Sequence, residues 1–223
     1  MAMAVEPRRL GAVRVVGWTI VWLAVLAVSA EFLLAVYGKY HSLDGPAYGR
    51  FMDRHGWLWL HLGGGLVTLL LGPVQFLGRL RRARPRLHRQ LGRVYLYGLL
   101  VASAAAAALI LTTPAPFSIR AGFAATALAW LSTALAGMVA IRHRRIEVHQ
   151  QWMVRNYVVS LAPVMFRLML PAAIALGQAP SSALVAMLLW ASWLLPLAIV
   201  EVFRRLLRHA RGDAQLTGRA PIA

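Results

Sequence analysis

Residues 92–111 read GRVYLYGLLVASAAAAALIL, and this stretch decides the fold. After Arg93 it carries no charged residue, and a helix of this length covers about 30 Å, the thickness of the hydrocarbon layer of a bilayer. An open strand in lipid would leave its backbone groups without hydrogen-bond partners. The stretch is therefore predicted to be a transmembrane helix.

Five similar apolar stretches lie on either side of this one. They run over about residues 15–36, 57–77, 122–141, 153–176 and 183–203. The 223-residue chain is 60% hydrophobic and 14% charged, with a mean hydropathy of +0.62, which excludes an ordinary soluble domain. We predict an all-α, polytopic membrane bundle of six transmembrane helices. It forms one integral membrane domain over residues 1–223, and residues 204–223 are a basic, disordered tail.

The formal net charge of +17 comes from short basic blocks between the apolar stretches. Nineteen of the 24 lysines and arginines fall on one side of the predicted spans, four fall on the other, and Arg167 lies inside a span. This asymmetry predicts that both termini are cytoplasmic. The same arrangement favours anionic lipid headgroups over nucleic acid as the partner.

The first apolar stretch has two interpretations. Arg8 and Arg9, the apolar run and the small residues at 28–30 are also typical of a cleaved secretory signal. The run continues to Val36, which favours an uncleaved anchor.

Two segments on the predicted cytoplasmic side have similar patterns: residues 88–95 read HRQLGRVY and residues 149–157 read HQQWMVRNY. Each opens a span with a histidine. The chain has no cysteine and seven acidic residues, so histidine is the main candidate metal ligand. His88 and His149 are suited to hold the iron of one haem b, while Arg89, Arg93 and Arg155 are suited to pair with its propionates. The alternative is that these histidines are interfacial and the arginines contact lipid headgroups.

A second polar group is expected nearer the outer face. His149 and Arg167 are 18 residues apart, which places them on one face of a continuous helix, together with Asn156 and Ser160. An arginine at that depth needs a partner or water. We expect Glu31 and His61 to approach Arg167, either as a structural ion pair or as a site that handles protons or anions.

The second span carries a line of small and polar residues. His61, Gly65, Thr68, Gly72 and Gln75 are spaced alternately four and three apart. Small residues let a neighbouring helix or a flat cofactor approach closely, and we favour helix packing. The sequence holds no nucleotide-binding, zinc-protease or nucleophile-elbow motif, so catalytic residues stay unassigned.

The residues from about 60 to 171 resemble a known family. The matching elements are His61 with its glycines, GPVQF at 72–76, His88-Arg89 with Gly92-Arg93 and Tyr95, Trp130, His149 with Trp152-Met153 and Arg155, and Arg167. On these elements the chain is identified as a member of a family of predicted bacterial membrane proteins of unknown function, DUF2306. That resemblance implies an inner-membrane location and no established activity.

The expected fold is also similar to transmembrane b-type cytochromes of the ascorbate-reducible kind, in which four central helices hold two haems between histidine pairs. Here His88 and His149 can form one pair, but His61 has no histidine partner at the outer end of the following helices. The resemblance therefore implies at most one haem, which would exchange electrons with a membrane redox partner or quinone.

Three functions stay open at this point. The first is electron transfer through one b-type haem. The second is a non-enzymatic scaffold or assembly factor that binds anionic lipid. The third is a small transporter that uses Glu31, His61 and Arg167.

Overall fold

The computed structural model describes residues 6–42, 49 and 51–216, and within these residues the chain is helical with no strand. Its elements are α1 (Glu6–Tyr40), the short 3-10 helix η1 (Met52–Arg54), α3 (His55–Gln75), α4 (Gly78–Ala83), α5 (Pro85–Thr112), α6 (Phe117–Arg142), α7 (Ile146–Ser160), α8 (Ala162–Ala175) and α9 (Ser182–Leu216). The predicted all-α class is confirmed.

Five helical segments of the described chain are long and apolar enough to cross a membrane. They are Trp22–Tyr40, Met52–Gln75, Pro85–Thr112, Phe117–Arg142 and Ser182–Leu206. α7 and α8 add a sixth span when the two are counted together, as a pair bent by 43°. The prediction of six spans holds in that sense, and the cytoplasmic position of both termini stays a prediction.

The bend between α7 and α8 interrupts the continuous helix face on which we expected both His149 and Arg167. α7 ends at Ser160 and α8 begins at Ala162, with Pro163 in its first turn. Proline has no N–H to donate, and its ring clashes with the carbonyl of the preceding turn, so a straight helix cannot continue through it. The predicted polar line from His149 is therefore interrupted after α7, and Arg167 belongs to a separate helix.

The chain divides into two compact units, Val36–Leu197 and the pair of terminal segments Met1–Ala35 and Ala198–Ala223. In the terminal unit, α9 is helical through residues 204–216, where we predicted a disordered tail. Leucine, arginine and alanine are strong helix formers, which accounts for the continuation. The rest of that tail, residues 217–223, lies outside the described residues.

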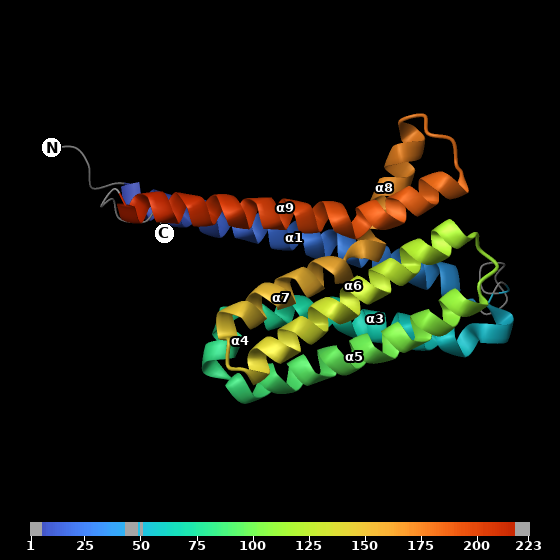
Figure 1. The fold of residues 1–223 in the computed structure, drawn as a ribbon, viewed down its shortest axis with the longest axis horizontal. Coiled ribbons are helices and arrows are strands. Elements are labelled where there is room, and N and C mark those ends of the chain that lie inside the picture. The colour runs from blue at the N-terminus through green and yellow to red at the C-terminus, as the bar shows by residue number, and fades with distance from the viewer. Residues whose placement is uncertain (1–5, 43–48, 50, 217–223) are drawn as a thin grey trace. The chain divides into compact units, whose positions relative to one another are not determined.

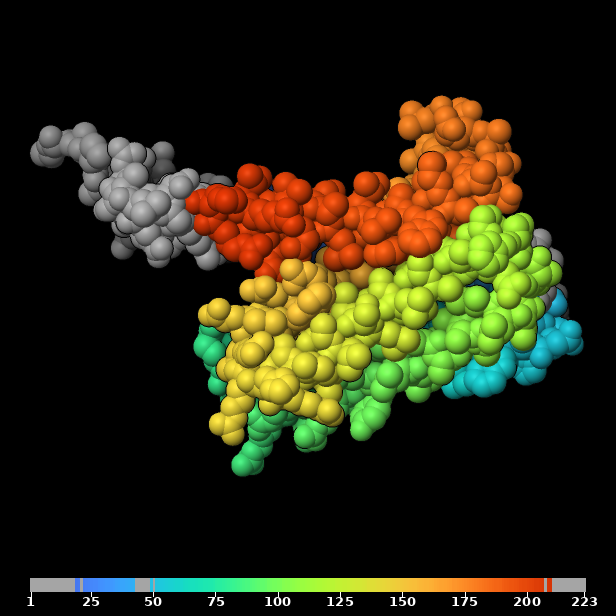
Figure 2. All heavy atoms as spheres, viewed as in Figure 1, coloured from blue at the N-terminus to red at the C-terminus, as the bar shows by residue number. Residues whose placement is uncertain are grey.

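Four helices of the larger unit, α3, α5, α6 and α7, form a bundle (Figure 1). α3 packs along α5 and α6 along α7, and the two pairs meet through α5–α6 and α3–α7 contacts. α5 and α7 therefore occupy opposite corners, so their inward side chains meet across the interior. In the space-filling view the side chains of α5, α6 and α7 form a continuous surface on the viewed face of this unit (Figure 2).

One end of this bundle carries the two basic connections, residues 78–89 and 142–149, and we call it the arginine-rich end. α5 starts there at Pro85, earlier than predicted, because proline suits the first turn of a helix. Its 28 residues span about 42 Å, more than the hydrocarbon layer needs. The first turns of α5, with His88, therefore extend toward the membrane surface.

Glycines set the close approach of α3 and α5. A side chain at Gly64 would collide with the Gly98 carbonyl and with Ala102, and one at Gly98 would meet Val67 at 2.9 Å. Gly72 packs directly on the Tyr157 ring. Gly65, which we had placed on the inward line, has no atom within 4 Å of an added side chain. Helix packing, rather than a ligand groove, is thus the role of Gly64 and Gly72.

Candidate functional site

His149 lies one turn into α7, half-buried, and contacts α6. Its Nδ1 is 2.8 Å from the carbonyl oxygen of Gly137. A carbonyl only accepts, so Nδ1 carries the proton and Nε2 keeps its lone pair. Gly137 lies on α6 and is buried against α7, where an added side chain would meet the Met153 sulfur at 2.9 Å. This absence of a side chain lets the two helices approach.

His88 lies one turn into α5 and contacts α3 through Gln75. In the amide orientation that satisfies its neighbours, Gln75 donates to Nδ1 of His88 at 3.0 Å and to its carbonyl oxygen at 3.2 Å. The amide oxygen then accepts from the Gly92 N–H at 3.3 Å. Gln75, predicted to be a polar interior residue, thus joins α3 to the first turns of α5. In this orientation the His88 proton resides on Nε2.

The structure brings His88 and His149 to the same end of the bundle, on the two opposite helices. Each is the fourth residue of its helix. Arg81, Arg89 and His149 are the titratable residues near enough to the His88 imidazole to interact with it. Among the described residues, no further hydrogen bond to either ring occurs. Both rings are therefore held through Nδ1, with Nε2 left for another partner.

The three arginines predicted to bind propionates, Arg89, Arg93 and Arg155, lie in different surroundings. Arg89 and Arg93 are exposed on α5. The guanidinium of Arg155 lies 4.7 Å above the centre of the Trp152 ring on α7. Arg81 on α4, which we had counted only for topology, acts on His88 across the turn between α4 and α5. In the sequence, nothing distinguished Arg81 from the other basic residues of that segment.

Further inside the bundle, Asn156 anchors a network of hydrogen bonds. It is fully buried, its Oδ1 accepts from the Tyr95 hydroxyl at 2.7 Å, and its Nδ2 donates to the Trp130 carbonyl at 2.8 Å and to Thr133 Oγ1 at 2.9 Å. Ser160 accepts from the Trp130 indole N–H at 2.7 Å and donates to the Asn156 carbonyl at 3.0 Å. Every polar atom of the Asn156 side chain is thus satisfied.

The sequence predicted an inward position for Asn156, and this is confirmed. It missed the partners. Tyr95 and Trp130 entered only as elements of the family resemblance, and Thr133 had no predicted role. A tyrosine in a stretch of alanines and leucines is the one signal that pointed to a buried hydroxyl needing a partner.

The structure does not bring the three outer polar residues together in one cluster of described contacts. They are Glu31, His61 and Arg167. His61 donates from Nδ1 to the Ala102 carbonyl oxygen on α5 at 3.0 Å, so its bond is to the helix backbone. Arg167 lies beyond the bend, on α8. Glu31 belongs to the terminal unit, so its approach to Arg167 and His61 stays a prediction.

Comparison with models of protein families shows which family this chain belongs to. The sequence model described as "Predicted membrane protein (DUF2306)" matches residues 58–204, about two thirds of the chain. The chain belongs to the DUF2306 family. The match covers the bundle, α8 and the apolar part of α9, and so reaches further than the resemblance seen over residues 60–171. No curated protein and no solved structure gives a significant match, so the likeness of this DUF2306 protein to b-type cytochromes stays an analogy.

The DUF2306 family is named for its membrane character, and it brings no ligand with it. Among the described residues, no three His, Asp or Glu side chains converge on a point that could hold a metal ion. A haem iron takes only two protein ligands, so His88 and His149 are judged on their own geometry.

Proposed function

We propose that this DUF2306 protein is a bacterial inner-membrane electron carrier that binds one b-type haem between His88 and His149. One observation carries the proposal. Two histidines on opposite helices, at one end of a bundle, are each hydrogen-bonded at Nδ1 to a protein group, and neither has a protein hydrogen bond at Nε2 among the described residues. Histidine ligands to iron are typically oriented in this way, with the second ring nitrogen fixed by a hydrogen bond.

The donor set fits a haem. His149 already has the required tautomer, because Gly137 accepts the Nδ1 proton. His88 reaches it when its proton moves to Nδ1 and the Gln75 amide turns over, since an amide offers an acceptor on one side and a donor on the other. That turn gives up the bonds from Gln75 to the His88 carbonyl and the Gly92 N–H. Gln75 is thus the group that adjusts.

The surroundings of the pair also suit a flat, anionic group. Gly92, one turn beyond His88, has no side chain, and a carbon added there would meet only the Gln75 amide oxygen, at 3.4 Å. Arg81 and Arg89 place positive charge beside His88, where propionates would be stabilised. The haem, when bound, supplies a one-electron carrier. The chain supplies two oriented imidazoles and positive charge beside them.

The position of the pair limits the route of electrons. His88 lies in the part of α5 that exceeds the hydrocarbon thickness, at the arginine-rich end, which the basic-residue count predicts to be cytoplasmic. His61, at the other end of the bundle, is bonded to the Ala102 carbonyl, and the sequence offers it no histidine partner at the outer end of the following helices. We therefore propose exchange with a membrane redox partner or quinone near one surface.

The test is an absorption spectrum of the full-length protein, purified in detergent from haem-replete cells, before and after reduction with dithionite. We expect a sharp α band in the reduced protein, one haem per chain, and loss of that band in His88→Ala and His149→Ala. His61→Ala is the matched control, because that histidine is also half-buried and bonded through Nδ1 to a carbonyl. A folded wild-type protein with no α band would overturn the proposal.

A further inference from the structure

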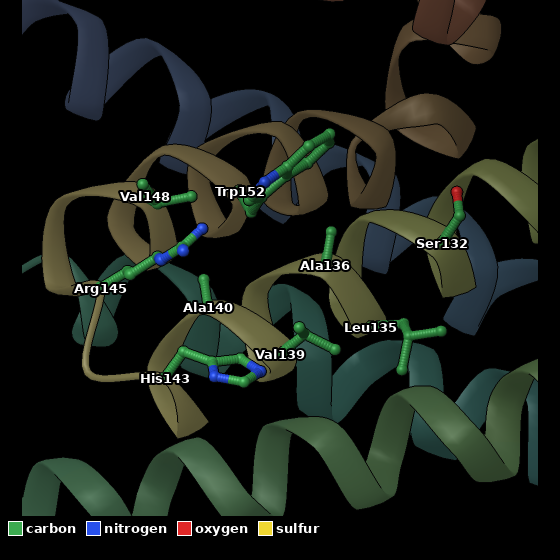
Figure 3. A pocket seen from close by; sticks show the side chains of 9 residues that line it. All are labelled: Ser132, Leu135, Ala136, Val139, Ala140, His143, Arg145, Val148 and Trp152. Carbon is green, nitrogen blue, oxygen red and sulfur yellow. The ribbon is translucent and has the colours of Figure 1, made fainter.

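A groove runs between α6 and α7, and neither His88 nor His149 lines it. It has a volume of about 430 Å³, and its walls are Leu135, Ala136, Val139 and Ala140 on α6 with Val148 and Trp152 on α7. Figure 3 shows these side chains on the two helices that face each other across the opening. The groove is open at its surface, because Leu135 and Val139 are 65% and 46% exposed.

The two ends of this groove differ in chemistry. Ser132 lies at the inner end and His143 at the arginine-rich end, with Arg145 on the connection to α7 (Figure 3). In the figure the Arg145 side chain extends into the space between the helices. Residues 142–145 are Arg-His-Arg-Arg, and Glu147 is the one acidic residue near them in sequence. The mouth of the groove is therefore strongly positive.

The length of the groove matches half of a bilayer. Ser132 and His143 are eleven residues apart on α6, which is about 16 Å along the helix axis. Half of the hydrocarbon layer is about 15 Å thick. An apolar channel of that length, open along a membrane helix and positive at its surface end, has the dimensions of one acyl chain with its headgroup.

The backbone at the mouth supports a role for the cations. Arg144 has a φ of 56°, the left-handed conformation in which glycine is the favoured residue. The Arg145 N–H closes this turn by bonding to the Ala140 carbonyl at 2.9 Å. The turn thus places Arg145 beside the groove that it lines. Arg144 occupies a backbone conformation in which glycine would be less strained.

We propose that this groove binds an anionic phospholipid, with one acyl chain along α6 and α7 and the phosphate held by Arg145 and His143. Charge complementarity selects an anionic headgroup, because two cationic or polar donors face it at the mouth. The Trp152 ring, covered on one face by the Arg155 guanidinium at 4.7 Å, forms a rigid wall for the chain. The site is separate from His88 and does not depend on haem.

The test is native mass spectrometry of the full chain with added phosphatidylglycerol or phosphatidylcholine. We expect one phosphatidylglycerol to be retained in preference to phosphatidylcholine, with affinity falling about fivefold in Arg145→Gln, which removes a cation, and by less in His143→Gln, which removes a polar donor. Arg86→Gln is the control, because Arg86 is exposed at the same end but does not line the groove. Thermal unfolding without lipid checks that each variant is folded.

A second variant separates chain binding from headgroup binding. Ala136→Leu narrows the apolar part of the groove without changing its charge, and it should also weaken phosphatidylglycerol binding. Glycerol phosphate, which has the headgroup charge without the chain, should not compete at equal concentration. Equal retention of the two phospholipids, unchanged affinity in Arg145→Gln, or unchanged affinity in Ala136→Leu would each overturn the proposal.

Discussion

The interior of the bundle and its arginine-rich end treat polar side chains differently. In the interior, both amide hydrogens and the amide oxygen of Asn156 have protein partners. At the end, His88 and His149 are each bonded at Nδ1 while Nε2 has no protein hydrogen bond in the described chain. A buried network with every atom satisfied stabilises a fold, whereas an oriented ring with a free nitrogen can take a ligand. The comparison separates structural from functional polar residues within one bundle.

The largest expected effect lies in the interior, where α3 meets α5. Gly64→Val would force a side chain into the Gly98 backbone and Ala102, and overpacking of this kind costs about 3 kcal/mol of unfolding free energy. Gly65→Val is the matched control, since nothing lies within 4 Å of its added carbon. Thermal unfolding in detergent compares the two. Equal melting temperatures would show that this crossing does not support the bundle.

The next effect is the loss of the Asn156 network. Asn156→Leu removes the amide partner of the buried Tyr95 and Thr133 hydroxyls. Tyr95 keeps Ser160 Oγ at 3.1 Å and Thr133 keeps the Ala129 carbonyl at 2.7 Å, so each loss costs about 1 kcal/mol. The double variant with Tyr95→Phe should be less destabilised than the sum of the two single variants, because the hydroxyl that lost its acceptor is gone. Strict additivity in thermal unfolding would mean that the two side chains do not depend on each other.

At the arginine-rich end we expect a substitution to change ligand binding much more than stability. His149→Gly removes one imidazole and one hydrogen bond to a helix carbonyl, so we expect a stability loss of about 1 kcal/mol, mostly from glycine in a helix, with complete loss of the haem α band. Added imidazole should restore the band, because it can occupy the space of the missing ring. An α band that persists in His149→Gly without imidazole would assign the iron ligand elsewhere.

The helical class, the spans and the inward position of Asn156 could be predicted from sequence, whereas the contacts between helices could not. Span length and charge asymmetry depend on residues close together in the chain, so the all-α class and the inward position of Asn156 followed from periodicity. The partners Tyr95, Trp130 and Thr133 lie on other helices, and the rotation of each helix about its axis is set by packing. Periodicity placed Gly65 rather than Gly64 on the packed face, and it placed His149 and Arg167 on one continuous face although Pro163 lies between them.

The smallest expected effect concerns the backbone of the arginine-rich end. Arg144→Gly replaces a residue with φ of 56° by the residue that adopts this conformation most easily, so unfolding free energy should rise by about 1 kcal/mol. Arg142→Gly removes an equal charge at the last residue of α6 and should lower stability by up to about 1 kcal/mol, because glycine is a poor helix former. Opposite shifts in melting temperature would show that backbone conformation, rather than repulsion among the four basic residues, determines the response. If both variants were stabilised by the same amount, relief of charge repulsion would explain the result. The backbone conformation of Arg144 would then not support a binding role for this end.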